Sequence, residues 1–171
     1  GYAYANYIVQ KDKKCTVILL GRTTESNLRE DYKARLAKLR TTKHHIIYAP
    51  IDIGNKDSIV ALEKLLATNK IETIDLILHT AGVAAKTALK EKTYDDIQQV
   101  LNPKVTGVEN LIKLSSSIEI NNMICCSSLS SILPSLGNME YTAANLYLDE
   151  ISYRSYSNIK SILTINLNQI S

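Results

Sequence analysis

The sequence has no apolar run long enough to span a membrane. A transmembrane helix needs about 20 consecutive, mainly apolar residues, and no run in these 171 residues approaches that length. No signal-peptide pattern opens the chain. We therefore expect a soluble, cytoplasmic protein without a membrane partner.

Cysteine is scarce and is not arranged as a framework. The chain has three cysteines, Cys15, Cys125 and Cys126, with no CxxC pair. Neither disulfide bonds nor a metal site is therefore predicted. We expect the adjacent Cys125 and Cys126 to fill a buried strand, where free cysteine is common.

Positive and negative charges nearly balance: the chain has 20 Lys and Arg and 17 Asp and Glu, which gives a net charge of +3. So small and dispersed a charge indicates no nucleic-acid surface. No internal repeat or low-complexity linker interrupts the chain. We expect one domain over residues 1–171, long enough to bury a core.

Short apolar runs alternate with longer segments of helical period. The predicted strands are 15–20, 45–51, 74–80, 122–127 and 161–167. The predicted helices are 2–10, 27–40, 56–68, 94–115 and 141–156. This alternation predicts an α/β fold, a Rossmann-like doubly wound parallel sheet with helices on both faces.

The residues at the ends of the predicted strands are of types that bind ligands. In open α/β sheets, ligands bind beyond the carboxyl ends of the strands. The residues at these ends are a glycine turn, a cation, a carboxylate and hydroxyls: Gly21, Arg22, Asp52, Ile53, Ala81, Gly82, Ser127 and Ser128. This arrangement is typical of a dinucleotide site.

The stretch 127–145, SSLSSILPSLGNMEYTAAN, carries a second group of polar side chains. If residue 140 begins a helix, the four-residue offset places Tyr141 and Asn145 on one face. The intervening loop then returns Ser128 to them. The stretch predicts a phenol, a hydroxyl and an amide around one small pocket.

Together with Lys104 in LNPKVTG and the segment LDE (148–150), these residues resemble the ketoreductase domain of a modular polyketide synthase or related fatty-acid synthase. This family is a branch of the short-chain dehydrogenase/reductase superfamily. Ordinary members of the superfamily carry Lys four residues after the catalytic Tyr and Asn at the upstream position. Here Asn145 and Lys104 are exchanged, as in synthase ketoreductases, and the resemblance covers nearly the whole chain.

The resemblance implies NADPH-dependent reduction of a β-ketoacyl thioester to the β-hydroxyacyl thioester. The implied partners are an acyl carrier protein, which bears the substrate on phosphopantetheine, and the other domains of the same synthase. Such a reduction needs a hydride on carbon and a proton on oxygen, and no side chain supplies a hydride. The hydride must come from a nicotinamide.

Each predicted catalytic residue has a chemical role. Tyr141 donates the proton, but a free phenol, with a pKa of about 10, is poorly matched to neutral pH. A nearby ammonium favours the phenolate, and this role is assigned to Lys104. Ser128 hydrogen-bonds the carbonyl oxygen, and Asn145 orients Lys104 or a water relay.

Arg22 decides the predicted choice of cofactor. A guanidinium at the end of this strand suits a 2′-phosphate and so favours NADPH, whereas a carboxylate favours NAD. By resemblance, Asp52 and Ile53 hold the adenine, and Ala81 with Gly82 lets the backbone approach the nicotinamide ribose. Gly1 stands where the family has the last glycine of the phosphate-binding fingerprint.

The chain departs from the family in several places. The rest of the glycine loop and the strand before it are missing, as are the C-terminal lid and the last strand. The missing first strand is central in this fold, so its neighbours would lack a partner, and we expect an excerpt of a larger synthase. The two marks of product stereochemistry are also absent: AGVAAK is not followed by LDD, and Leu133 replaces a Trp eight residues before Tyr141.

Other interpretations stay open at this point. Taken singly, Lys104 and Asn145 are ordinary surface residues, the serine cluster is a loop or helix cap, and Arg22 pairs with Glu25. The three histidines, His44, His45 and His79, are read as structural. Two rival functions are a catalytically silent, structural ketoreductase-like domain and a free-standing short-chain dehydrogenase.

Overall fold

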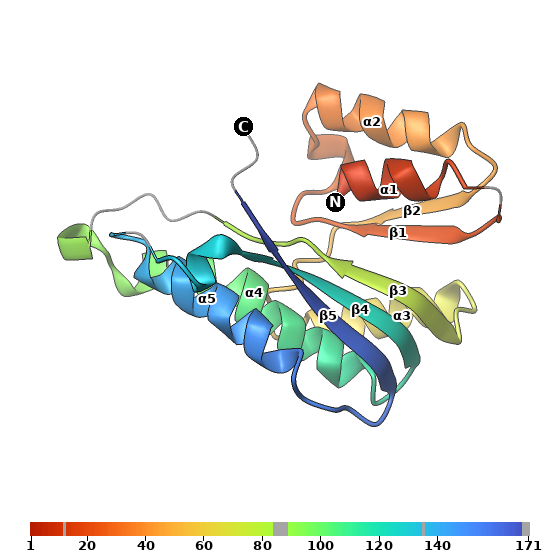
Figure 1. The fold of residues 1–171 in the computed structure, drawn as a ribbon. Coiled ribbons are helices and arrows are strands. Elements are labelled where there is room, and N and C mark those ends of the chain that lie inside the picture. The colour runs from red at the N-terminus through yellow and green to blue at the C-terminus, as the bar shows by residue number, and fades with distance from the viewer. Residues whose placement is uncertain (12, 84–88, 135, 169–171) are drawn as a thin grey trace. The chain divides into compact units, whose positions relative to one another are not determined.

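The structure, a computed structural model, describes residues 1–11, 13–83, 89–134 and 136–168 (Figure 1). Its contacts divide the chain into an N-terminal unit, Gly1–Asp52, and a C-terminal unit, Ile53–Ser171. Each unit is described by itself. Residues 84–86 of AGVAAK and the end of NLNQIS lie outside the described residues.

The N-terminal unit packs two helices on two parallel strands. Its elements are α1 (Tyr2–Ile8), β1 (Thr16–Leu20), a 3₁₀ turn (Glu25–Asn27), α2 (Glu30–Arg40) and β2 (His45–Ala49). β1 pairs in parallel with β2, with Ile18 opposite Ile47. The core of the unit is apolar and is drawn from both helices and from β2: Ala5, Val9, Leu36, Leu39 and Ile46.

Helix α2 begins three residues later than the predicted 27–40. Leu28 and Arg29 have extended backbones after the 3₁₀ turn, so the helix begins at Glu30. Acidic Glu30 and Asp31 in the first turn, and basic residues in the last, complement the helix dipole. The charged face of α2 is solvated and includes an exposed Lys33–Glu30 pair at 2.9 Å.

The C-terminal unit has a three-stranded parallel sheet in the order β3-β4-β5. Its elements are α3 (Ser58–Thr68), β3 (Thr73–His79), α4 (Tyr94–Leu114), β4 (Glu119–Ser128), α5 (Met139–Ile151) and β5 (Ile159–Leu167). Two 3₁₀ turns, Leu89–Glu91 and Leu129–Ser131, precede α4 and α5. Parallel strands flanked by helices confirm the predicted α/β class.

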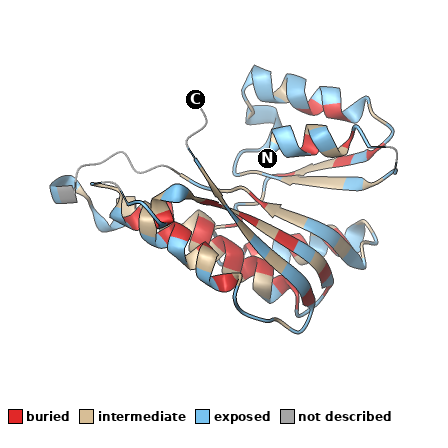
Figure 2. Cartoon of the chain, viewed as in Figure 1, coloured by how far each residue is buried: buried red, intermediate tan, exposed pale blue. Residues whose placement is uncertain are grey.

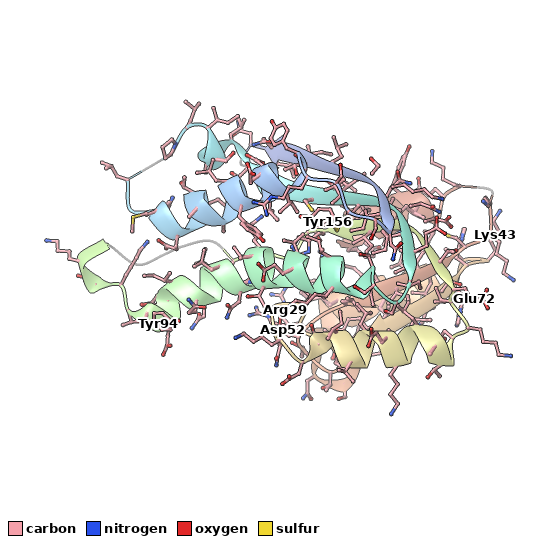
Figure 3. All side chains as sticks on the ribbon, turned by 90° about the horizontal axis from the view of Figure 1, so that it is seen from below. Arg29, Lys43, Asp52, Glu72, Tyr94 and Tyr156 are labelled. Atoms are coloured by element: carbon pink, nitrogen blue, oxygen red, sulfur yellow. The ribbon has the colours of Figure 1, made fainter. Side chains whose placement is uncertain are left out.

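Helices α3, α4 and α5 form one layer on the sheet of this unit (Figure 3). Burial in β4 alternates from Met123 onward: Met123, Cys125 and Ser127 are buried, whereas Ile124 and Cys126 are partly exposed. Figure 2 shows buried and partly exposed residues along the strands of this sheet. The sequence indicated strands buried on both faces. Within this unit the described helices cover one face, so the apolar runs alternate in exposure.

Helix α5 ends earlier than the predicted 141–156. After Ile151 the chain turns, and the Ser152 hydroxyl donates to the Asp149 carbonyl at 2.7 Å, which satisfies one of the free carbonyls at the helix end. Tyr156 then forms an antiparallel bridge with Ile159. These local bonds replace the helical continuation.

Strands β1 and β3 each have one pairing neighbour among the described residues, β2 and β4 respectively. No helix in the described residues is long and apolar enough to cross a membrane. The same residues contain no cluster of three or more His, Cys, Asp or Glu side chains that would suit a metal ion.

The buried histidine at the end of β3 predicts how stability changes with pH. His79 is 4% exposed, and burial lowers its pKa to about 4, with a smaller contribution from Lys104. Between pH 4 and the ordinary pKa of about 6.5, the unfolded chain therefore binds more protons at this residue than the folded chain does. The contribution of His79 to the free energy of unfolding is therefore at its maximum above pH 6.5. It falls by roughly 3 kcal/mol as the pH drops toward 4.

Urea unfolding between pH 7.5 and 5 measures this dependence. In His79→Gln the fall in the free energy of unfolding should be much smaller than in the wild type. The matched variant is His45→Gln, because His45 is exposed, and it should retain the wild-type slope. An unchanged slope in His79→Gln would contradict the assignment.

Candidate active site

Lys104 is a buried cation in the middle of α4. It is 4% exposed, and its Nζ donates a hydrogen bond to the Cys126 carbonyl at 2.7 Å. Burial lowers the pKa of Lys104, and interactions with Cys126, Cys125 and Asp149 partly oppose this. The interpretation of Lys104 as a solvated surface residue is therefore wrong.

Tyr141 and Lys104 face each other where α4 packs against α5. Lys104 Nζ lies 5.9 Å from the centroid of the Tyr141 ring. At this distance, and away from bulk water, an ammonium interacts appreciably with charge that develops on a phenol. The structure thus brings together the two residues that the sequence paired as acid and cation.

Asn145 lies one turn after Tyr141 on α5 and is fully buried. Its Nδ2 donates to the Tyr141 backbone carbonyl at 2.7 Å. Its Oδ1 is buried and has no hydrogen-bond partner in the described part of the chain. Because an unpaired buried acceptor is costly, this oxygen is poised to receive a donor such as an ammonium or a water.

Ser128 ends β4 at the entrance to the 3₁₀ turn. Its Oγ accepts from the Ser130 N–H at 3.2 Å, so it acts as a cap, as the alternative interpretation suggested. The turn is held against α5, because the Thr142 hydroxyl donates to the Ser130 carbonyl at 3.2 Å. Next to it, the buried Ser127 hydroxyl donates to the Asn145 carbonyl at 3.2 Å.

A polar side chain from β5 supports the same turn, and the sequence did not reveal it. Asn166 Nδ2 donates to Ser131 Oγ at 2.8 Å and to Asp149 Oδ2 at 3.0 Å. The bonds join β5, the turn and α5. An isolated Asn near the end of a strand gives no local signal of such a role.

Gly82, which follows β3, lies against the Lys104 side chain. A Cβ at this position would lie 3.1 Å from Lys104 Cε and 3.6 Å from its Nζ. A glycine therefore leaves room for the lysine. Ala81 is partly buried beside it, so the predicted cofactor segment at the end of β3 adjoins Lys104.

The segment that starts at Ile53 also packs on α4. Ile53 is 7% exposed, and its carbonyl accepts from Asn110 Nδ2 at 2.8 Å, as does the Asn55 carbonyl. A Cβ on Gly54 would lie 3.0 Å from the Asn102 backbone. Neither Asn110 nor Gly54 was identified from the sequence as part of the site.

A helical glycine completes this packing. A Cβ on Gly107 would lie 3.2 Å from both the His79 ring and Ile53 Cγ2. Glycine inside a helix is unfavourable by about 1 kcal/mol relative to alanine, so its place in α4 was the available signal of a close contact. The carboxyl end of β3 and the segment after β2 thus both meet α4 within one turn of Lys104.

The N-terminal unit contains the other predicted cofactor residues, Gly1, Gly21, Arg22 and Asp52. A Cβ on Gly21 would lie 2.6 Å from the Tyr48 hydroxyl, which donates to the Thr23 carbonyl at 2.6 Å. Only a residue without a side chain fits under this tyrosine.

Arg22 is exposed at the end of β1. The acid that the sequence offered it, Glu25, instead pairs with Arg40 at 2.5 and 2.9 Å. The ion pairs between described residues do not include Arg22. Asp52 is exposed, and Gly1 is the N-cap of α1.

Comparison with known proteins identifies the family of the chain. Polyketide synthase PksN of Bacillus subtilis (strain 168) is 34% identical over 158 residues, which are 92% of this chain and 3% of PksN. Polyketide synthase PksL of the same organism is 31% identical over 156 residues, 91% of this chain and 3% of PksL. The chain thus spans a small fraction of the curated relatives it matches.

A solved ketoreductase domain from the bacillaene assembly line superposes with a TM-score of 0.88 at 27% identity, covering 98% of this chain and 41% of that one. An N-terminal ketoreductase from the macrolactin assembly line gives 0.86 at 29% identity, covering 98% and 34%. The family model of the KR domain matches residues 1–171. The chain belongs to the KR domain family, the ketoreductase domains of polyketide synthases with the short-chain dehydrogenase/reductase fold.

Proposed function

We propose that this domain reduces a β-ketoacyl thioester to the β-hydroxyacyl thioester with NADPH during polyketide synthesis. The observation that carries the proposal is the buried ammonium of Lys104 beside the Tyr141 ring. A buried charge is costly unless it is paired or hydrogen-bonded, and the position of this ammonium beside a phenol indicates a use for the charge. In a ketoreductase family, carbonyl reduction supplies that use.

The proposed mechanism follows from the positions of the side chains. Tyr141 donates its hydroxyl proton to the carbonyl oxygen as negative charge builds there. Lys104 stabilises the charge that remains on the phenol, because the ammonium already lies in place and needs no rearrangement. Ser128 turns its hydroxyl from the cap of the 3₁₀ turn to the carbonyl oxygen.

Asn145 completes the proposed path of protons. Its free Oδ1 accepts a hydrogen bond from Lys104 or from a water between them. The bond from its Nδ2 to Tyr141 fixes the amide, so the acceptor has a defined direction. Asn145 thereby orients the group that restores the proton on Tyr141.

The residues of the chain fit a nicotinamide cofactor. When bound, NADPH supplies the hydride. Ala81 and Gly82 would receive the nicotinamide ribose, and the absence of a Cβ on Gly82 leaves this region open beside Lys104. We infer that Arg22 binds the 2′-phosphate, Asp52 and Ile53 hold the adenine, and Gly1 lies near the phosphates.

We further infer that the substrate is delivered by an acyl carrier protein on phosphopantetheine and that other synthase domains adjoin this one. The relatives PksN and PksL are polyketide synthases of which this chain matches about 3%. A silent structural domain and a free-standing dehydrogenase are the rival proposals. The full set Lys104, Ser128, Tyr141 and Asn145 favours an active domain, and its Lys–Asn exchange favours a synthase.

Removing the phenolic hydroxyl tests the proposed acid. Tyr141→Phe should lower thioester-dependent NADPH oxidation at least about 100-fold, the usual contribution of a positioned acid, with NADPH affinity nearly unchanged. The matched control is Tyr153→Phe, because Tyr153 is 85% exposed. Tyr141→Phe with wild-type turnover would remove Tyr141 from the mechanism.

Filling the space at Gly82 tests its contact with the catalytic lysine. In Gly82→Ala the new Cβ should displace the Lys104 side chain, which lies 3.1 Å away. The contact requires a shift of a few tenths of an ångström, and displacements of about 1 Å can lower rates about 100-fold, so we expect turnover to fall several-fold while the fold persists. Steady-state kinetics and circular dichroism measure both, and turnover within twofold of wild type would contradict the contact.

Reversing the charge at Arg22 tests cofactor choice. A charge-assisted hydrogen bond contributes about 1.5–3 kcal/mol, so Arg22→Asp should shift the NADPH/NADH ratio of kcat/KM at least tenfold toward NADH. Arg154→Asp makes the same charge change at an exposed residue near the end of α5 and should leave the ratio unchanged. An unaltered ratio in Arg22→Asp would exclude Arg22 from the cofactor site.

A further inference from the structure

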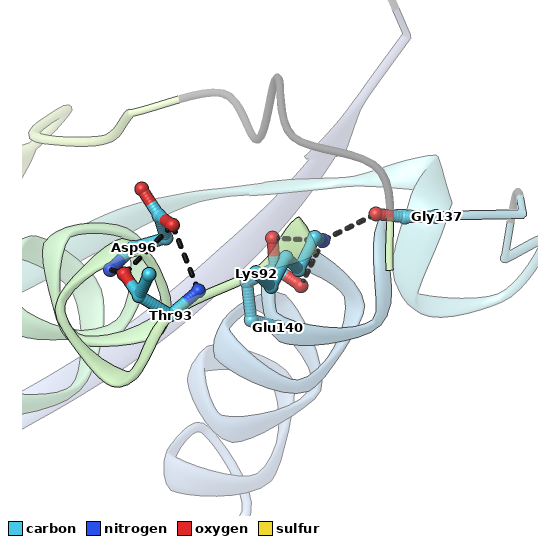
Figure 4. A network of polar contacts seen from close by, with 5 residues as sticks. All are labelled: Lys92, Thr93, Asp96, Gly137 and Glu140. Carbon is cyan, nitrogen blue, oxygen red and sulfur yellow. Dashed lines mark hydrogen bonds and ion pairs between the residues drawn. The ribbon is translucent and has the colours of Figure 1, made fainter. Parts of the chain in front are cut away.

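Lys92 forms a buried ion pair next to the candidate active site. Its Nζ lies 2.5 Å from both carboxylate oxygens of Glu140 and also donates to the Gly137 carbonyl (Figure 4). The side chains of Lys92 and Glu140 are 2% and 3% exposed. Neither residue belongs to the catalytic set described above.

Each hydrogen of the Lys92 ammonium has an oxygen acceptor. An ammonium has three hydrogens, and three oxygens receive them: two from Glu140 and one from Gly137. Exposed ion pairs contribute little, but a buried pair resists the loss of either partner, because the other charge would remain without compensation. Lys92 and Glu140 therefore hold their two segments firmly together.

The segments that this pair joins lead directly to the catalytic residues. Lys92 precedes Thr93, which caps α4 in a reciprocal pair with Asp96 (Figure 4). Glu140 is the second residue of α5 and precedes Tyr141. One ammonium thus connects the starts of the helices that carry Lys104 and Tyr141.

The start of α5 is also held against the 3₁₀ turn by the bond from the Thr142 hydroxyl to the Ser130 carbonyl. Its N-cap, Asn138, makes no side-chain capping bond. Gly137 has a φ of +82°, a left-handed conformation that glycine adopts readily. The bond from Lys92 to the Gly137 carbonyl and the pair with Glu140 anchor this turn on both sides of Asn138.

We propose that Lys92 is a positioning residue for Tyr141. It fixes the first turn of α5 and so holds the Tyr141 hydroxyl where Lys104 and the carbonyl oxygen can share its proton. The effect on turnover rests on the proposed reductase function, whereas the anchoring of α5 does not. The two parts are therefore measured separately.

The variants are compared in the full-length polypeptide. Lys92→Met removes the ammonium, and Lys92→Arg retains a cation. Lys92→Met/Glu140→Gln removes both charges, so that no uncompensated carboxylate stays buried and the fold is preserved. The matched control is Lys90→Met, because Lys90 is an exposed lysine two residues earlier.

We expect Lys92→Met and the double variant to lower kcat at least about tenfold, as a small displacement of a catalytic group does. KM for a β-ketoacyl thioester should change much less, since Lys92 is assigned no contact with substrate. Lys92→Arg should recover most of kcat, and Lys90→Met should match the wild type. Hydrogen exchange at the backbone of residues 138–145 should be faster in Lys92→Met and in the double variant than in Lys90→Met.

Wild-type kcat and wild-type exchange in the double variant would overturn the proposal and leave the pair a purely structural role. If the wild type fails to reduce any β-ketoacyl thioester, the proposed function fails, and hydrogen exchange alone decides the anchoring. Faster exchange at residues 138–145 would then support it. Unchanged exchange in a folded Lys92→Met or double variant would refute it.

Discussion

A lysine that leaves water needs acceptors and space inside the protein, and the C-terminal unit supplies both to Lys104. The Cys126 carbonyl accepts one hydrogen bond at 2.7 Å, and Gly82 leaves room for the side chain. The Tyr141 ring lies 5.9 Å from the ammonium. Because burial lowers the pKa of Lys104, the site holds a cation that gives up a proton more readily than a solvated lysine. The proton relay that we propose from Lys104 to Tyr141 would depend on this burial.

The packing of α4 on α5 and on the sheet fixes the positions of Lys104 and Tyr141 relative to each other. The Tyr147 hydroxyl donates to Glu109 across the two helices at 3.0 Å, and the Thr164 hydroxyl donates from β5 to the Leu148 carbonyl at 2.8 Å. Lys92 joins the starts of the helices, and Asn166 joins β5 to the turn after β4. The side chains that we propose as catalytic therefore lie on elements joined at several points, as preorganised catalysis requires.

The sequence predicted the order of the helices and strands because their hydrophobic periods differ clearly. It also predicted Tyr141 and Asn145 on one helical face, since a four-residue offset fixes this without tertiary information. The end of α5 was predicted too late, because the Ser152 and Tyr156 contacts that end it have no distinct local signature. Two contacts join residues that are far apart in the sequence. Lys92 and Glu140 are 48 positions apart, and Asn110 and Ile53 are 57 positions apart. Only the folded chain shows that these ordinary polar residues are partners.

In the proposed reaction, hydride and proton reach the two ends of one carbonyl group at this site. The most direct test of this proposal is the reaction of the full-length polypeptide with a β-ketoacyl thioester and NADPH that carries deuterium at both C4 positions of the nicotinamide. We expect a β-hydroxyacyl thioester with one deuterium on the β-carbon, as detected by mass spectrometry. Unlabelled hydroxyacyl product, or NADPH consumption without that product, would contradict it.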